Sequence, residues 1–191
     1  GINKSKLELP GEYESKLNSL IGLSTVKDSV KKIKAYALAN KDSGALNIHM
    51  CFYGNPGTGK TEVARNIAGI LYENKILPSK NLIEVDRADL VSQYLGETPQ
   101  KTLAKIRESM GGVLFIDEAY SLIPSHSGFD YGHEAVSTLI KAMEDYRGKF
   151  CVILAGYRNK MLDMLSSNPG FRSRIQFELD FPNYSRDELK S

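Results

Sequence analysis

The sequence lacks tryptophan, has only two cysteines and contains no apolar run long enough to cross a membrane. Cys51 and Cys151 each lie within a short apolar stretch, which favours small buried side chains with free thiols over a disulfide. Apolar stretches such as 113–116 and 151–155 are far shorter than the roughly 20 residues of a membrane-spanning helix. Residues 1–10 carry no apolar run typical of a signal peptide. We therefore expect a cytoplasmic protein.

An excess of charge of one sign is also lacking, since 25 Lys and Arg residues face 23 Asp and Glu residues. Proteins that bind nucleic acid or anionic membranes usually carry a clear basic excess. We therefore expect no nucleic acid and no membrane among the partners. His49, His126 and His133 have no cysteine or carboxylate at the spacing of a metal site, so we expect them in isolated surface or packing roles.

Short apolar runs alternate with segments of helical period, a pattern typical of βαβ units. The length of 191 residues suits one domain or a domain with a fragment. The sequence therefore predicts an α/β fold with a five-stranded parallel sheet and helices on both faces. The predicted strands are 47–53, 81–86, 112–117, 150–155 and 174–179.

The predicted helices fill the gaps between these strands, at 60–72, 98–110 and 131–146. An earlier helix, capped by Ser24 or Thr25, carries Val26, Val30, Ile33 and Ala37 on one face. The loop at 121–128 is longer and contains Pro, Ser and Gly, so we expect it to move. We divide the chain into an N-terminal extension or helix at 1–20, a nucleotide-binding α/β domain at 21–182, and the start of a further domain at 183–191.

The segment Gly54-Asn55-Pro56-Gly57-Thr58-Gly59-Lys60-Thr61 matches the phosphate-loop pattern and lies between a predicted strand and a predicted helix. Its glycines let backbone N–H groups turn toward phosphate oxygens, and the helix directs its positive dipole end to the same anion. Lys60 is expected to reach the β- and γ-phosphates of ATP. Thr61 can offer its hydroxyl to Mg²⁺, which prefers oxygen ligands.

Asp117 and Glu118 follow directly after the apolar run 113–116, at the strand end where open α/β sheets bind ligands. A carboxylate there can hold Mg²⁺ through water, and a second can orient or deprotonate the water that attacks the γ-phosphate. We assign the first role to Asp117 and the second to Glu118.

The phosphate loop, the strand that ends in Asp117-Glu118 and the upstream segment Leu20-Ile21-Gly22-Leu23 together resemble the AAA+ superfamily, over residues 20–189. Within it, the segments 85–90, 111–120, 153–157 and 168–174 resemble the CbxX/CfqX branch, which includes red-type Rubisco activases, stage V sporulation protein K and cytosolic ATPases of type VII secretion. The resemblance implies a ring-forming ATPase, hexameric in the full-length protein, that remodels an unspecified protein client.

The resemblance also implies roles for single residues. Tyr94-Leu95-Gly96 is similar to the aromatic, hydrophobic, glycine pore loop that grips a polypeptide, and an aromatic side chain on a glycine-hinged loop suits contact with any sequence. The alternative is that Tyr94 packs on the core beside Val91. Arg172 and Arg174 lie where the family supplies an arginine to the neighbouring subunit's γ-phosphate, and we prefer Arg174.

The γ-phosphate sensor departs from the family pattern, because its position falls near Tyr157, with Asn159 two residues later. The arginine sensor of the C-terminal lid has no counterpart within the sequence, so 183–191 is interpreted as the start of a truncated lid. The resemblance places the adenine contacts at Ile21, Gly22 and Leu23, with Val26 as an apolar wall.

The sequence therefore leaves three candidate functions. A protein-remodelling ATPase is favoured over a phosphate-loop ATPase that acts on nucleic acid, such as a helicase loader, because of the even charge and the Tyr94 loop. A non-catalytic nucleotide switch is the third, and Glu118 favours hydrolysis over binding alone.

Overall fold

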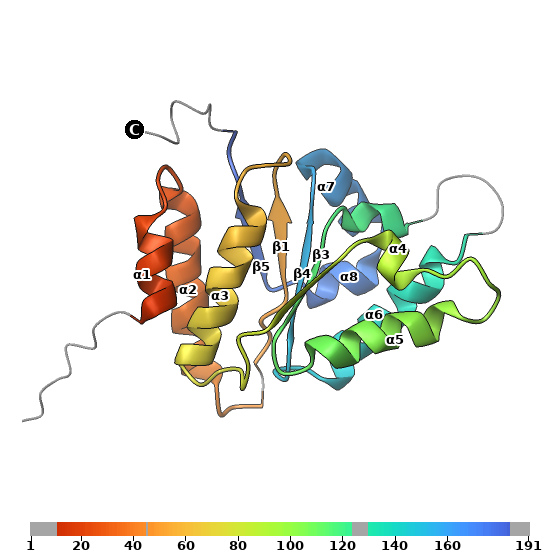
Figure 1. Ribbon diagram of the computed structural model, residues 1–191, viewed down its shortest axis with the longest axis horizontal. Helices are drawn as coiled ribbons and strands as arrows, with labels where there is room; N and C mark the ends of the chain where they lie inside the picture. Colours follow the sequence, from red (N-terminus) through yellow and green to blue (C-terminus); the bar gives the residue numbers. More distant parts are fainter. Residues whose placement is uncertain (1–10, 45, 124–129, 184–191) are drawn as a thin grey trace, which may run out of the picture.

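The computed structural model describes residues 11–44, 46–123 and 130–183 (Figure 1). One sheet contains five strands in the order β2-β3-β4-β1-β5, and each neighbouring pair is parallel. The strands are β1 Met50–Tyr53, β2 Leu82–Val85, β3 Val113–Ile116, β4 Cys151–Gly156 and β5 Phe177–Asp180. The predicted α/β class and the five-stranded parallel sheet are confirmed.

Helices precede and separate the strands, and the longer ones bury an apolar stripe in the core. In α3, for example, Val63, Ile67 and Leu71 recur at helical spacing and are fully buried. The helices of the described residues are α1 Glu12–Ser19, α2 Ser24–Asn40, α3 Lys60–Glu73, α4 Arg87–Leu90, α5 Thr98–Ser109, the 3-10 helix η1 Ala119–Leu122, α6 Gly132–Asp145, α7 Arg158–Ser167 and α8 Pro169–Arg174.

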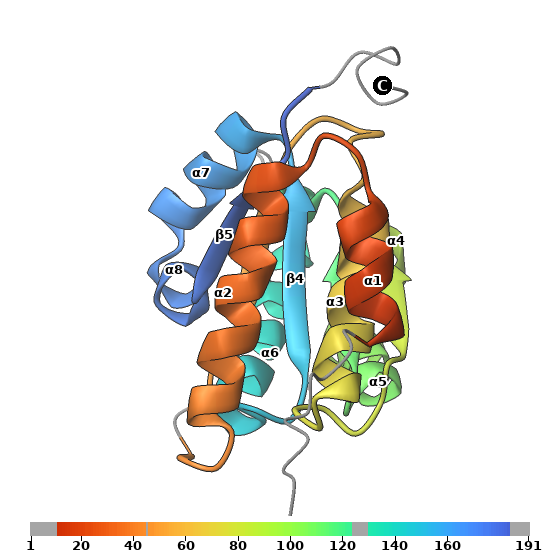
Figure 2. The same ribbon diagram turned by 90° about the vertical axis from the view of Figure 1, so that its left-hand side faces the viewer.

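The sheet is covered on both faces, as predicted. Helices α1, α2 and α3 lie on one face and α4 to α8 lie on the other (Figures 1 and 2). Because successive side chains of a strand point to opposite faces, each central strand supplies both cores. Met50 and Phe52 of β1 belong to the cluster under α2 and α3, whereas Cys51 and Tyr53 belong to the cluster under α5 and α6.

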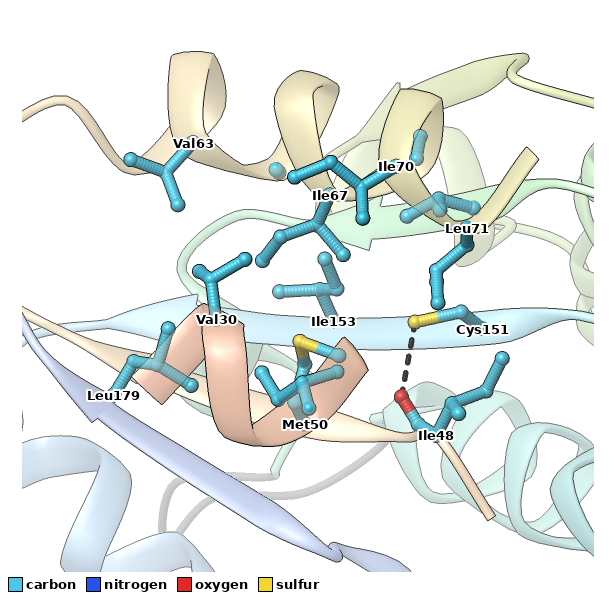
Figure 3. Packing of buried hydrophobic residues seen from close by; sticks show 14 of the residues in the cluster. Val30, Ile48, Met50, Val63, Ile67, Ile70, Leu71, Cys151, Ile153 and Leu179 are labelled. Carbon is cyan, nitrogen blue, oxygen red and sulfur yellow. Dashed lines mark hydrogen bonds between the residues drawn. The ribbon is translucent and has the colours of Figure 1, made fainter. Parts of the chain in front are cut away.

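The core under α2 and α3 is closely interlocked. Val30 of α2 and Ile67 of α3 meet Met50 and Ile153 of the sheet (Figure 3). At one side of this core the Cys151 thiol donates a hydrogen bond to the carbonyl oxygen of Ile48, over 3.1 Å. Both cysteines are buried free thiols, and burial raises the pKa of each, that of Cys51 to about 12. They are therefore packing residues without thiolate chemistry.

The chain order of the strands produces a crevice at one edge of the sheet. After β1 the chain crosses to the edge strand β2 and then returns through β3 and β4. The carboxyl ends of β3, β4 and β1 consequently lie side by side, with Tyr53 paired to Gly156 and Ile116 to Leu154. Ligands of open α/β sheets bind at such a switch point.

Three local predictions are corrected by the structure. The last strand begins at Phe177 instead of at residue 174, because Asn168 caps α8, which continues to Arg174. Neither Ser24 nor Thr25 caps α2: Leu23 occupies the cap position, and no side chain bonds there. Ser121 lies in η1 and not in a loop.

Some predictions fall outside the described residues: those on His126, on most of the loop at 121–128, on 1–10 and on 184–191. Within the part of the chain that the structure describes, no helix has both the length and the apolar character needed to cross a membrane.

Candidate nucleotide-binding site

A cavity of about 430 Å³ opens at the carboxyl ends of β1, β3 and β4. It unites residues that are far apart in the sequence. Its walls are Gly54, Pro56, Gly57, Gly59, Lys60 and Thr61 of the phosphate loop, Glu62 of α3, Asp117 and Glu118 after β3, and Gly156 and Tyr157 after β4. Asn55 and Thr58 of the loop do not line it. The fold therefore brings the predicted phosphate loop and the predicted carboxylate pair to one place.

The phosphate loop has the backbone that its glycines permit. Gly57 and Gly59 adopt φ of 77° and 92°, a left-handed region that other residues rarely enter. Gly59 is also the N-cap of α3, so the first N–H groups of that helix face the loop. A helix N-terminus next to inward-turned amides is a favourable site for a phosphate group.

Lys60 is held at the base of this loop. The residue is only 8% exposed, and its ammonium donates to the carbonyl oxygens of Gly54 and, over 3.3 Å, of Asn55. Burial lowers the pKa of Lys60, and the charges of Asp117 and Glu118 oppose that shift. The Lys60 ammonium is bonded only to neutral carbonyl oxygens among these contacts, so it can attract an anionic ligand. The two nearby carboxylates suit a divalent cation that is bound to the same ligand.

Asp117 and Glu118 form a tight turn at the end of β3. Asp117 Oδ1 accepts a hydrogen bond from the Glu118 backbone N–H over 2.9 Å. Glu118 has a φ of 49°, which is unusual for a residue other than glycine and stores backbone strain of about 1 kcal/mol or more. Such strain is typical of functional sites.

Thr61 has a neighbour that the sequence reasoning did not identify. Its hydroxyl lies 3.5 Å from Oε1 of Glu84, on the edge strand β2. Gly156 and Glu62 line the cavity and were also missed. No motif marks Glu84 or Glu62. Gly156 lies in the segment 153–157 that carries the family resemblance, but its place in the cavity follows from the pairing of β4 with β1.

A second cavity, of about 360 Å³, adjoins the first and is lined by Ile21 and Leu23 together with Gly57 and Gly59. The predicted adenine segment therefore lies against the phosphate loop. Gly22, between the two apolar residues, turns the chain with a φ of 79°. Val26 is 1% exposed and belongs to the core, so it is not among the residues that line this cavity.

The two sensor candidates differ in position. Tyr157 lines the nucleotide cavity, whereas Asn159 is exposed on α7 and does not line it. The Tyr157 and Tyr120 rings lie 6.4 Å apart, and the Lys160 ammonium lies over both, at 5.4 Å and 4.8 Å from their centroids. The geometry favours Tyr157 of the two.

The Tyr94-Leu95-Gly96 segment lies on the surface between α4 and α5. Tyr94 is 67% exposed and Leu95 is 82% exposed, and Gly96 turns the chain with a φ of 78°. The alternative in which Tyr94 packs on the core is therefore wrong. Large apolar side chains this exposed are a candidate contact surface.

Arg172 and Arg174 lie in the last turn of α8, and neither residue lines the cavity at the phosphate loop. The Arg172 side chain is 56% exposed and that of Arg174 is 25% exposed. The structure thus leaves them no direct role in their own chain's cavity.

Residues 50–183 match the family model of the ATPase family associated with various cellular activities (AAA). The chain belongs to the AAA family. Nucleotide binding is general to a family of ATPases, and the predicted resemblance is confirmed. Stage V sporulation protein K of Bacillus subtilis (strain 168) is 44% identical over 194 residues, covering 98% of this chain and 60% of that protein.

Two further relatives support the predicted branch of the AAA family. Protein CbbX of Cereibacter sphaeroides is 46% identical over 89% of this chain and 57% of its own length. The chloroplastic ribulose bisphosphate carboxylase/oxygenase activase of Cyanidioschyzon merolae (strain NIES-3377 / 10D) is 45% identical over 89% of this chain and 60% of its own length. The chain thus spans about three fifths of the curated relatives that it matches.

Solved AAA structures share the fold. The FIGL-1 AAA domain in complex with ADP has a TM-score of 0.64 at 20% identity, over 89% of this chain and 56% of that one. A chain of the HORMA:CdnC:Trip13 complex of E. coli MS115-1 has a TM-score of 0.62 at 20% identity, over 93% of this chain and 68% of that one. At this identity the likeness concerns the fold alone.

Proposed function

We propose that this chain is the Mg·ATP-binding and ATP-hydrolysing core of a ring-forming AAA motor that acts on a protein client. One observation carries the proposal: Lys60, Thr61, Asp117 and Glu118, which come from two distant segments, surround a single cavity. Their side chains are those required to neutralise phosphates, to hold Mg²⁺ and to direct a water molecule.

Each residue has a distinct part in this proposal. Lys60 and the amides of the phosphate loop hold the β- and γ-phosphates, while Thr61 and Asp117 supply the oxygen ligands that Mg²⁺ prefers. When bound, Mg²⁺ neutralises the charge that develops on the phosphates. Glu118 orients the attacking water and accepts its proton, and Tyr157 hydrogen-bonds near the γ-phosphate.

The protein client is supported by the exposed Tyr94 and Leu95, since an apolar loop can grip a polypeptide through shape and apolar contact without reading its sequence. One relative bears the name of an activase of another protein, ribulose bisphosphate carboxylase/oxygenase. We further propose that the full-length protein is cytoplasmic and hexameric, with Arg174 of one subunit reaching the γ-phosphate held by the next.

Calorimetry of Mg·ATP binding tests the first part of the proposal. Lys60→Ala should abolish binding, because it removes the cation that meets the phosphates. Glu118→Gln should bind ATP as the parent does and yet lose nearly all turnover. Lys31→Ala, on the exposed side of α2, is the matched control and should leave both properties unchanged. Parent-like binding of Mg·ATP by Lys60→Ala would refute the assignment of the phosphate loop.

The alternatives give other results in the same assays. A helicase-loader-like ATPase would be stimulated by single-stranded DNA and not by unfolded polypeptide. A nucleotide switch would bind ATP, and its Glu118→Gln variant would turn over no more slowly than the parent.

A further inference from the structure

A cavity of about 540 Å³ lies between the carboxylate turn and the start of the Tyr94 loop. It is lined by residues of the segment 86–93 on one side and by Glu118, Ser121 and Tyr131 on the other. Glu118 also lines the nucleotide cavity. The two cavities therefore meet at the residue to which we assign water activation.

One side chain connects the two sides of this cavity. Arg87, the first residue of α4, donates from Nη1 to the carbonyl oxygen of Ser121 over 2.7 Å and from Nη2 to Asp130 Oδ1 over 2.6 Å. The Arg87 side chain is 36% exposed and that of Asp130 is 19% exposed, so the pair is partly shielded from water. A guanidinium that donates to two acceptors at once fixes direction as well as distance.

On the catalytic side, one acceptor of Arg87, Ser121, is bonded to the backbone of Glu118. The Ser121 N–H donates to the Glu118 carbonyl oxygen over 2.9 Å, which makes Ser121 part of the same turn. Asp130 Oδ1 also accepts from the Gly132 N–H over 2.8 Å. A Cβ at Gly132 would lie 2.1 Å from the Leu122 carbonyl oxygen, so η1 and the start of α6 are in close contact.

The ionic state of Asp130 suits this arrangement. Burial alone would raise the pKa of Asp130, but the hydrogen bonds from Arg87 and Gly132 outweigh it and leave the pKa below its usual value. The carboxylate therefore stays charged at neutral pH and keeps its bond to Arg87.

On the loop side, α4 ends at Leu90 and a short hydrogen-bonded segment leads from it to Tyr94. Asp86 and Asp89 form a reciprocal capping box around the start of α4. At its end, the Ser92 N–H donates to Thr98 Oγ1 over 3.0 Å, and the Tyr94 N–H donates to Ser92 Oγ over 3.0 Å. The segment between α4 and Tyr94 is therefore short and internally bonded, so we expect a displacement of α4 to reach the backbone of Tyr94.

We propose that Arg87 is a positioning residue that couples the Glu118 turn to the Tyr94-Leu95-Gly96 loop, so that the state of the bound nucleotide sets the position of the loop. The inference rests on the proposed function, since it requires ATP at the cavity and a working loop. The proposed path has three steps. The Glu118 carbonyl oxygen accepts a hydrogen bond from Ser121, and Ser121 and Asp130 accept hydrogen bonds from Arg87. Arg87 begins α4, which precedes the loop. Arg87 touches neither nucleotide nor client in this scheme, and its effect is on the communication between them.

Hydrogen exchange of the full-length protein, with and without a non-hydrolysable Mg·ATP analogue, tests the inference. In the parent, the analogue should slow exchange in 54–61 and change it in 87–97. In Arg87→Ala, 54–61 should respond as before, while exchange in 87–97 should become roughly tenfold faster and lose its response, because two charge-assisted hydrogen bonds are gone. Arg87→Lys keeps the charge but cannot span both acceptors, and it should lose most of the response with an unchanged melting temperature.

Arg107→Ala, an exposed arginine of α5, is the matched control and should behave as the parent. A parent in which 54–61 does not respond would overturn the proposed function and this inference with it. A response in 54–61 combined with an unaltered response of 87–97 in both Arg87 variants would overturn this inference alone. So would a parent whose 87–97 segment ignores the analogue, or an equal loss in Arg107→Ala.

Discussion

Arg172 is paired with Glu178 of its own chain, with Nη1 lying 2.9 Å from Oε1 of that carboxylate. Arg174, two residues later, is held differently: Nη1 donates to the Gly170 carbonyl oxygen over 3.0 Å, and Nε lies 3.6 Å from Oε2 of Glu144. The Arg174 Nε atom is buried and has no hydrogen bond within the described residues. Arg174 is therefore held less completely than Arg172, whose Nη1 lies at hydrogen-bond distance from a carboxylate.

Arg174→Ala in the full-length protein should reduce ATP turnover by roughly 10³-fold, because a neighbour's guanidinium stabilises the charge on the transferred phosphoryl group. Arg174→Ala and Glu118→Gln should each be nearly inactive alone. When mixed, they should regain turnover at every site that combines an intact Glu118 with an intact arginine from the next subunit. The measurement is steady-state turnover after subunit exchange.

Arg172→Ala serves as the matched comparison for that experiment, since Arg172 lies in the same helix turn and also forms an ion pair. It should retain most of the turnover. If exchange of subunits is verified and the Arg174 mixture gains nothing, Arg174 does not act in trans. Arg172→Ala would then replace Arg174→Ala in the mixing experiment.

Tyr94→Ala in the full-length protein should leave basal ATP turnover within a few-fold of the parent, because Tyr94 does not line the nucleotide cavity. The increase in turnover caused by unfolded casein, used as a generic polypeptide, should disappear. Tyr72→Ala is the control, since Tyr72 is 45% exposed on α3. A Tyr94→Ala variant that loses ATP binding or its circular dichroism spectrum would show that the residue supports the fold instead.

Gly57→Ala and Gly44→Ala form a matched pair that separates backbone strain from ligand binding. Their φ angles are 77° and 72°, and a Cβ at either position would meet nothing within 4 Å. Each substitution should therefore cost a similar free energy of unfolding, about 1 kcal/mol, measured by urea titration. Only Gly57→Ala should weaken ATP binding in calorimetry. Equal ATP affinity in the two variants would argue against phosphate contact at Gly57.

His49 predicts a pH dependence of stability. Burial, with smaller contributions from Arg147 and Arg174, lowers the pKa of His49 to about 4 from 6.5. Because the unfolded chain takes up the proton at a higher pH than the folded one, stability is complete above pH 6.5. It then falls by about 3 kcal/mol as the pH drops toward 4.

Urea unfolding at a series of pH values between 7 and 4 measures that loss. His49→Gln should be less stable at pH 7, because His49 accepts a hydrogen bond from the Val152 N–H and lies 3.2 Å from the Met143 carbonyl oxygen. Its dependence on pH should nevertheless be weaker than in the parent. His133→Gln, an exposed histidine, should reproduce the full dependence, and an equal loss of slope in both variants would contradict the assignment.

The sequence predicted the sheet and the helices on both its faces because their apolar periodicity is strong. The start of β5 was predicted too early because apolar residues precede it. Phe171 is buried within α8 and Ile175 is its C-cap, and apolar residues at these positions would equally suit a strand. Apolar runs of this length do not distinguish the two structures. The cap of α2 was missed because Leu23 is buried there, so packing outweighs the preference for a serine or threonine cap.

The phosphate loop and the carboxylate pair could be predicted from local pattern, since each is a contiguous motif with a mechanism. The proximity of Glu84 to Thr61, and the bonds of Arg87 to Ser121 and Asp130, could not be predicted. Both depend on which segments the folded chain places side by side, and their side chains look like ordinary charged residues in the sequence. The choice between Tyr157 and Asn159 likewise required knowing which one faces the cavity.

The position of β4 between β3 and β1 has a consequence for the order of folding. Val152 bonds to His49 across 103 residues of sequence, and this contact joins the central pair of strands. Until β4 has been synthesised and inserted, the phosphate loop after β1 and Glu118 after β3 have no shared wall. Such long-range pairing forms late, because the entropy of closing a long loop must be overcome first. We therefore expect the site to be completed late in folding, because a nascent chain that ends before residue 151 lacks the strand that joins its two halves.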